Sequence, residues 1–224
     1  MITFRVLSAL LNYPVPELTG ETAQAERILR EEGLLTDRHL EIVCEFVRGL
    51  SDRPQLELES AWIEAFDRGR STSLYLFEHI HGDSRDRGQA MVKLLMRYRM
   101  HGLELKSGEL PDFLPLFLEF LSMCPLNGAR KHLLEISDIV ALIGQRLRKR
   151  GAAYASLLDA IASLVPGDIA EQPPAADSST EDRDDTPAAL DAAWEESPVT
   201  FTDTPLPASQ PAATAAIPVL SKRD

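Results

Sequence analysis

The segment 111–121, PDFLPLFLEFL, is apolar on nearly every side when it is wound as a helix. Pro111 suits the first turn, because a helix does not use the N–H that proline lacks there. Asp112 follows, and the positive end of the helix dipole favours a carboxylate at that place. A short helix that is apolar all round is surrounded by other elements. We therefore predict that this segment is the central helix of the fold.

The rest of the sequence up to residue 166 supplies helices that can surround it. Apolar side chains recur at helical spacing, and Pro or Gly separates successive runs, with a turn expected at 125–128. The sequence has no strand alternation beside a hairpin turn, although the segment 74–77, LYLF, taken alone fits a strand as well as a helix. We expect one compact all-α, multi-helix domain over residues 1–166. Its expected helices are 2–13, 21–32, 37–50, 54–66, 72–80, 84–105, 111–121, 129–149 and 152–165.

Residues 167–224 differ from the rest in composition. They contain eight prolines together with many Ala, Asp, Ser and Thr residues. They also carry most of the acidity, since the formal net charge of the chain is -12 and -9 of it falls after residue 165. This acidity argues against nucleic acid as a partner. Such a segment buries too little apolar surface to offset the entropy of ordering, so we predict a disordered acidic, Pro/Ala-rich C-terminal tail. A short helical turn at Leu190, Ala193 and Trp194 is the alternative.

The sequence gives no sign of export or membrane insertion. Residues 1–14 are apolar but too short for a span, and they lack the basic start and the cleavage site of a signal peptide. No window of about 20 apolar residues follows them. Cys44 and Cys124 are far apart and have no metal-type spacing, which is typical of buried thiols in a reducing compartment. We expect a soluble cytoplasmic protein.

Charge, aromatic rings and histidine are concentrated in residues 62–88, WIEAFDRGRSTSLYLFEHIHGDSRDRG. Two runs that alternate Asp with Arg flank the apolar segment 74–77, which suggests that these runs face each other. A separate basic run, 146–150, is typical of the end of a helix, and an interaction patch is the alternative.

Catalytic and metal-binding patterns are absent from this sequence. It contains no H-E-x-x-H, no pair of C-x-x-C motifs, no P-loop, no G-x-G-x-x-G and no serine in a nucleophile-elbow context. His79 and His81 are two residues apart, so in a helix they point to different sides. Arginines beside the paired carboxylates keep them ionised, which argues against a general acid. We expect no catalytic residue, no metal site and no cofactor; a metal- or nucleotide-dependent enzyme is the alternative of another class.

Several motifs in this chain match a known family. The matching residues are Phe66-Asp67-Arg68, Arg70, Leu74-Tyr75-Leu76, His79, His81-Gly82-Asp83-Ser84-Arg85, Arg87-Gly88, Ala90-Met91, Leu11-Asn12-Tyr13-Pro14 and Glu109-Leu110-Pro111-Asp112-Phe113-Leu114. This pattern resembles the NarJ family of respiratory nitrate reductase assembly chaperones, within the wider TorD-like family of redox-enzyme maturation chaperones. The resemblance covers residues 4–165.

The resemblance implies a TorD-like helical bundle that acts by binding rather than by catalysis. The implied client is the apo catalytic (alpha) subunit of respiratory nitrate reductase, bound through its N-terminal segment in the cytoplasm. The chaperone would keep this subunit competent for molybdenum cofactor insertion and complex assembly, and would delay membrane docking. A chaperone for the signal peptide of a twin-arginine-exported molybdoenzyme is the alternative within the family, and the sequence HGDSRDRG at 81–88 favours the first.

A chaperone that holds an amphipathic peptide needs an apolar groove with charged margins. Phe66, Leu74 and Tyr75 can supply the groove, and the charged residues near them can supply the margins. In the alternative interpretation, the apolar side chains belong to the core and the charges pair internally. The residues expected to bind the client peptide are Phe66, Asp67, Arg68, Arg70, Leu74, Tyr75, His79, His81, Asp83, Arg85, Arg87, Pro111 and Asp112.

Overall fold

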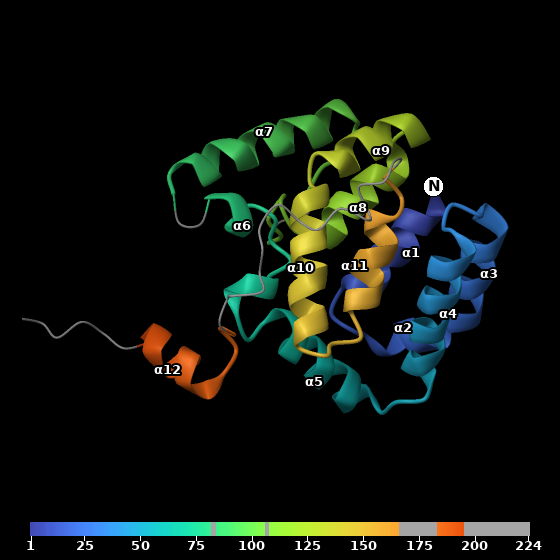
Figure 1. Cartoon of the computed structure of the whole chain (residues 1–224). Coiled ribbons are helices and arrows are strands. Elements are labelled where there is room, and N and C mark those ends of the chain that lie inside the picture. The colour runs from blue at the N-terminus through green and yellow to red at the C-terminus, as the bar shows by residue number, and fades with distance from the viewer. Residues whose placement is uncertain (82–83, 106–107, 166–182, 195–224) are drawn as a thin grey trace, which may run out of the picture.

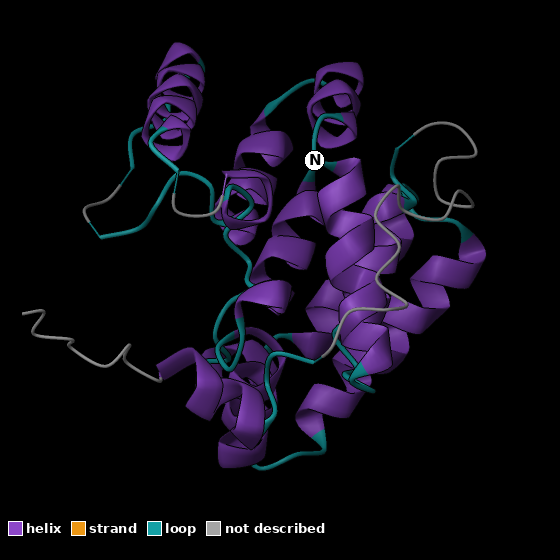
Figure 2. Cartoon of the chain, turned by 60° about the vertical axis from the view of Figure 1, so that its left-hand side comes forward, coloured by secondary structure: helices purple, strands orange, loops and turns teal. Residues whose placement is uncertain are grey.

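A computed structural model of the chain describes residues 1–81, 84–105, 108–165 and 183–194 (Figure 1). Within these ranges the chain forms twelve α-helices and one turn of 3-10 helix, with a single isolated β-bridge and no longer strand. The predicted all-α fold is confirmed for this part of the chain (Figure 2). The elements are α1 (Ile2–Leu11), α2 (Pro16–Gly20), α3 (Thr22–Glu32), α4 (Asp37–Ser51), α5 (Gln55–Phe66), η1 (Arg70–Thr72), α6 (Glu78–His81), α7 (Asp86–Met100), α8 (Leu114–Met123), α9 (Leu126–Leu134), α10 (Ser137–Lys149), α11 (Ala155–Ala162) and α12 (Pro187–Trp194).

The helix α8 lies in the core, as its apolar circumference predicts. Leu114, Leu118 and Leu121 are all buried, and α1 packs along the helix. The hydroxyl of Ser8 in α1 donates a hydrogen bond of 2.7 Å to the carbonyl of Pro115 in α8. The helices α3 and α11 pack against α1, and α4 and α10 pack against these in turn. The core is therefore built outward from the pair formed by α1 and α8.

The helix predicted over residues 72–80 does not form. Leu74 and Leu76 are buried while Tyr75 between them is only half-buried, so the side chains alternate as they do in a strand. Tyr75 forms an isolated antiparallel bridge with Phe113. The structure thus selects the extended interpretation of the segment LYLF.

The same bridge changes the start of α8. The Leu76 N–H donates to the carbonyl of Asp112 at 2.9 Å. The Leu114 N–H donates to the carbonyl of Leu74 at 2.8 Å. Because residues up to 113 are held in this pairing, the helix begins at Leu114 and not at Pro111 as predicted. Asp112 therefore precedes the helix instead of lying in its first turn.

The predicted helix 129–149 is two helices, α9 and α10, which meet at Ile136. Ile136 is buried with a φ of -117°, so the chain turns there to bring this side chain into the core. Pro125 precedes α9 directly, and the expected turn at 125–128 is instead the first turn of that helix. Apolar residues at helical spacing fit one long helix as well as two shorter ones, so the sequence pattern did not show the break.

The helix α7 is shorter than the predicted helix 84–105. It ends at Met100, and the chain then turns through Gly102 with a φ of 74°, a backbone conformation that favours glycine. Leu94 and Tyr98 are its buried side chains. The helix crosses the edge of the molecule near α6 and α9 (Figure 1).

Most of the predicted tail, residues 167–182 and 195–224, lies outside the described residues. Residues 183–194 contain α12, which forms where the sequence offered a short helical turn as the alternative. Cys44 and Cys124 are buried free thiols, as predicted. No helix in the described ranges is long and apolar enough to cross a bilayer.

Candidate functional site

The described part of the stretch 62–88 runs from the end of α5 through η1, the bridged segment 73–77 and α6 to the first residues of α7. The turn η1 packs against both α5 and α10. The stretch therefore links the core helices to the α6–α7 region, and its two charged runs lie on either side of the bridge.

Two of the predicted groove residues belong to the core. Phe66 is only 6% exposed, and its ring lies 4.9 Å from the ring of Tyr154 and 5.5 Å from that of Trp62, measured between centroids. Leu74 is only 2% exposed. In this structure neither side chain presents a surface to a peptide, and both lie beneath the surface of the candidate site.

Tyr75 is the predicted groove residue that reaches the surface. Its ring lies 5.3 Å from the ring of Phe113, and its hydroxyl donates a hydrogen bond of 3.2 Å to Oε1 of Glu109. Burial of the hydroxyl, together with the neighbouring charge of Glu109, raises the pKa of Tyr75 to about 12. The hydroxyl is therefore a hydrogen-bond donor at physiological pH.

Asp112 is fully buried and joins three segments. Its Oδ2 accepts a hydrogen bond of 3.1 Å from the Phe77 N–H and lies 3.7 Å from Nη2 of Arg87. Arg87 also donates to Oε1 of Glu78 at 3.3 Å. Burial raises the pKa of Asp112, although the Phe77 N–H and Arg87 act in the opposite direction. Asp112 and Arg87 thus pair internally, which is the alternative interpretation of the charged margins.

Pro111 takes part in the same junction through its backbone. Its carbonyl accepts a hydrogen bond of 2.7 Å from the hydroxyl of Tyr98 in α7, and both residues are buried. The contact fixes the end of the α6–α7 region to the start of α8. Like Asp112, Pro111 lies beneath the surface of the site.

The two histidines have separate surroundings, as their spacing predicts. The Nε2 of His79 lies 2.8 Å from the carbonyl of Ser73, and its Nδ1 lies 3.5 Å from Nη1 of Arg146. Burial lowers the pKa of His79, so the ring is neutral near pH 7 and donates from Nε2. The ring of His81 instead packs edge-on against Phe77 at 5.8 Å. Among the described residues there is no cluster of His, Cys, Asp or Glu that could hold a metal.

The remaining predicted site residues are at the surface or outside the described ranges. Asp67, Arg68 and Arg70 are exposed around the end of α5, and Arg85 is exposed just before α7. Asp83 is not among the residues that the structure describes. The exposed members are the ones that can meet a partner without a change in the core.

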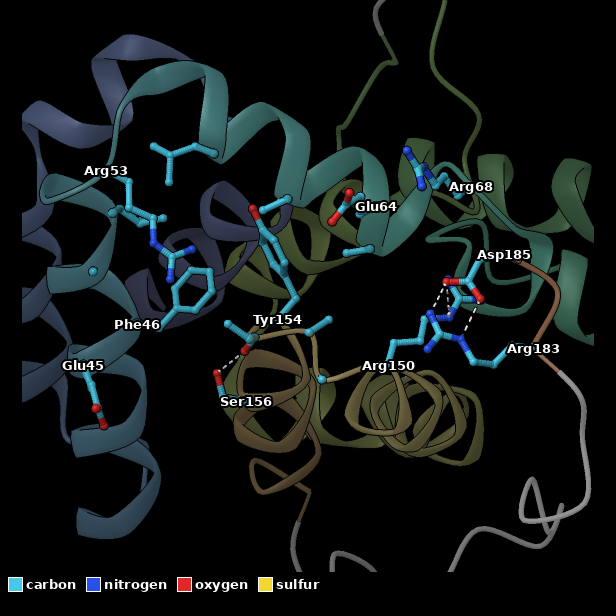
Figure 3. A pocket seen from close by; sticks show the side chains of 18 of the residues that line it. Glu45, Phe46, Arg53, Glu64, Arg68, Arg150, Tyr154, Ser156, Arg183 and Asp185 are labelled. Atoms are coloured by element: carbon cyan, nitrogen blue, oxygen red, sulfur yellow. Dashed lines mark hydrogen bonds and ion pairs between the residues drawn. The ribbon is translucent and has the colours of Figure 1, made fainter. Parts of the chain in front are cut away.

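A cavity of about 960 Å³ opens beside this surface, between α4, α5 and the turn that joins α10 to α11 (Figure 3). Of the predicted site residues, only Arg68 lines it. The aromatic rings of Phe46 and Tyr154, with centroids 5.1 Å apart, form part of its wall. The lining combines apolar, basic and acidic side chains: Phe46, Leu50, Leu58, Ala61, Ala65 and Tyr154; Arg53, Arg68, Arg150 and Arg183; and Glu45, Glu64 and Asp185.

Sequence reasoning missed most of this cavity. Phe46 and Arg53 come from α4 and its C-terminal end, and Tyr154 comes from the start of α11, so nothing in the local sequence joins them. One available signal was the basic run 146–150, because Arg150 is its last member. The cavity combines apolar walls with charged side chains of both signs, a combination that can hold an amphipathic peptide.

Comparisons with known proteins identify the family of this chain. The family model described as "Nitrate reductase delta subunit" matches residues 34–159, a range that contains every predicted site residue. The probable nitrate reductase molybdenum cofactor assembly chaperone NarW of Escherichia coli K12 is 43% identical over 203 residues, which cover 90% of this chain and 84% of the relative. NarJ of the same organism, a chaperone of the same description, is 43% identical over 201 residues, covering 90% and 85%. The probable NarJ of Bacillus subtilis is 31% identical over 164 residues, covering 73% and 88%. The chain therefore belongs to the NarJ-type family of nitrate reductase molybdenum cofactor assembly chaperones.

Proposed function

We propose that this chain is a system-specific chaperone that binds the N-terminal segment of the apo catalytic subunit of a respiratory nitrate reductase. It holds that subunit competent for molybdenum cofactor insertion and complex assembly before membrane docking. The names of its relatives support the maturation role. The observation that carries the binding proposal is the cavity of about 960 Å³, whose lining combines apolar side chains with charged ones of both signs.

The cavity fits one face of an amphipathic helix. Such a helix presents apolar side chains at positions i, i+3, i+4 and i+7 and keeps its polar side chains outside. Apolar side chains of the peptide would contact Phe46, Leu58 and Tyr154, while Arg53 and Arg68 would meet its acidic or carbonyl groups. The exposed residues Asp67 and Arg70 would then extend this margin along the end of α5.

Apolar contacts supply most of the affinity in this proposal. Burial contributes about 25 cal/mol per Å², so a few hundred Å² gives several kcal/mol before the costs of ordering the peptide. Ion pairs at an exposed rim give about 0–1 kcal/mol each and are screened by salt. The arginines therefore set the orientation of the peptide more than its affinity, and binding should weaken only modestly from low to physiological salt.

Isothermal titration calorimetry with a synthetic peptide of the catalytic subunit's N-terminal segment tests the proposal. The wild-type chain should bind with a negative heat-capacity change. Ala61→Trp places a large ring in the cavity and should weaken binding at least tenfold. Ala23→Trp, at an exposed position of α3 outside the cavity, is the matched control and should bind like the wild type. Unchanged affinity of a folded Ala61→Trp chain would show that the peptide binds elsewhere.

A charge reversal tests the margin separately. Asp67→Arg combined with Arg70→Glu keeps the net charge and changes only the sign at each position. We expect weaker peptide binding with an unchanged circular dichroism spectrum, and Arg99→Glu on α7 serves as a surface control. If the double variant binds with wild-type affinity, these two residues do not contact the peptide.

A further inference from the structure

The chain's own segment Arg183–Pro187 closes one side of the cavity. Arg183, Asp185, Thr186 and Pro187 line the cavity together with residues of α4 and α5. Figure 3 shows the carboxylate of Asp185 held between the guanidinium groups of Arg150 and Arg183. The segment therefore occupies space at the rim that a bound peptide would need.

Asp184 anchors this segment in a polar site at η1. Its Oδ2 accepts a hydrogen bond of 2.8 Å from the Ser71 N–H, and its Oδ1 accepts one of 2.6 Å from the Ser71 hydroxyl. The same Oδ1 accepts from Nη2 of Arg150. One carboxylate thus receives a backbone N–H, a hydroxyl and a guanidinium, which is the donor set expected of a carboxylate-binding site.

Arg150 is fixed in place for this contact. Its side chain is only 5% exposed. Its Nη1 donates to Oγ1 of Thr72 at 2.8 Å, and its Nη2 donates to Oγ of Ser71 at 2.7 Å. The Thr72 hydroxyl in turn donates to the carbonyl of Ala65 at 2.6 Å. The guanidinium is therefore oriented by the folded domain, independently of the carboxylate that it binds.

Gly69 leaves room for the carboxylate. A Cβ built at this position would lie 2.7 Å from the carboxylate atoms of Asp184. The backbone of Gly69 has φ -156° and ψ 154°, which is extended chain that any residue adopts. Glycine is therefore needed here for space and not for backbone conformation, and only while a carboxylate is in the site.

Asp185 completes the attachment. Its side chain is 7% exposed, and its Oδ2 lies 2.8 Å from Nη2 of Arg183 and 3.6 Å from Nε of Arg150. The hydrogen bonds from Arg183, opposed by burial, keep the pKa of Asp185 below its ordinary value. Burial alone would raise the pKa of Asp184, but the hydrogen bonds from Ser71 and the charge of Arg150 lower it. Both carboxylates are ionised at neutral pH.

We propose that the turn Gly69–Thr72 and Arg150 form a carboxylate-binding site whose ligand in the free chaperone is Asp184, and that the segment Arg183–Pro187 is a reversible occupant in competition with the client. This proposal rests on the proposed function, because it concerns the same cavity. Asp184 and Asp185 hold the segment through polar contacts with Ser71, Arg150 and Arg183, so it can leave when a peptide with larger apolar surface enters. Client binding then releases the tail.

A titration without any client tests the carboxylate site. The probe is a fluorescently labelled peptide of residues 183–194, RDDTPAALDAAW, and the readout is anisotropy with the full-length chain. In wild type the site is occupied in cis. In Asp184→Asn with Asp185→Asn it is vacated, so the peptide should bind this variant at least tenfold more tightly. Adding Arg150→Gln should remove that binding. Equal binding to wild type and the double variant, or none to either, overturns the carboxylate site.

Gly69→Ala tests the competition. The added methyl group expels the Asp184 carboxylate without straining the backbone, so the client N-terminal peptide should bind severalfold more tightly than to wild type. Gly88→Ala, in α7 with open space around its Cβ, is the matched control and should leave the affinity unchanged. If the client binds wild type and Gly69→Ala equally, the competition is wrong while the proposed function stands. If the client binds neither chain, the proposed function fails, and the titration without client still decides the carboxylate site.

Discussion

Replacing Asp112 with alanine separates a structural role from a client-contacting role for this predicted site residue. The carboxylate is 0% exposed, and its Oδ2 accepts the Phe77 N–H at 3.1 Å. Alanine leaves that buried N–H without an acceptor, which costs about 1–3 kcal/mol. The substitution also removes the carboxylate that lies 3.7 Å from the guanidinium of Arg87. Of its ion pairs with Asp112 and Glu78, Arg87 then keeps only the one with Glu78. Since breaking a fully buried pair costs about 3–5 kcal/mol and this arginine is only partly buried, we expect a total loss of about 2–4 kcal/mol.

Asp112→Asn is the matched variant, because it keeps an acceptor oxygen for the Phe77 N–H and loses only the charge. Burial raises the pKa of Asp112 above its ordinary value of 3.8. In the window between the two values the folded chain binds more protons than the unfolded chain, so stability falls as pH rises through it. Asparagine does not titrate. The free energy of unfolding of Asp112→Asn should therefore increase relative to that of the wild type as pH rises from about 4.

Urea unfolding followed by circular dichroism at several pH values measures both effects. The structural role is refuted if Asp112→Ala unfolds within about 0.5 kcal/mol of wild type, the usual range for surface substitutions. A chain of unchanged stability that no longer binds the client peptide would make Asp112 a contact residue instead.

Two further predictions concern the core and its pH dependence. Leu118→Ala, in the middle of α8, removes a fully buried side chain and should cost about 2–5 kcal/mol in urea unfolding, whereas Leu56→Ala, at an exposed position of α5, should change little. Burial lowers the pKa of His79 in the folded chain below its unfolded value of about 6.5. The free energy of unfolding therefore decreases as pH falls from about 6.5 toward the folded-state pKa, because the unfolded chain takes up the proton first. His79→Gln should lose less stability than wild type over this window, with His101→Gln as the control; parallel curves for wild type and His79→Gln would contradict the assignment.

The sequence predicts those elements whose evidence is local. An apolar circumference is enough to place α8 at the centre, and helical spacing is enough for α1, α3, α4 and α5. Four apolar residues such as LYLF fit either period, and here the choice depends on backbone groups of residues 112–114, far along the chain. Local pattern contains no information on such a partner, which is why the helix at 72–80 was a wrong prediction.

The candidate site was predictable only in part, for the same reason. Arg68 belongs to a motif that attracts attention by its charge, but Phe46 and Tyr154 are ordinary apolar positions of two helices until the fold brings them together. The run 146–150 ends a helix, as predicted, and its last member also binds a carboxylate. Residue type identified the arginine, whereas its partner Asp184 follows from tertiary structure alone.

The bridge between Tyr75 and Phe113 holds together the two ends of a long loop of the chain. Residues 78–111, which include α6 and α7, form this loop. The entropic cost of closing such a loop grows only with the logarithm of its length, so doubling the number of residues in the loop costs about 0.6 kcal/mol. Provided that Leu94 and Tyr98 keep their buried contacts, this loop can gain or lose turns of helix without disturbing α8. The exposed side chains of α7, Val92, Met96 and Met100, can therefore change without altering the core around α8.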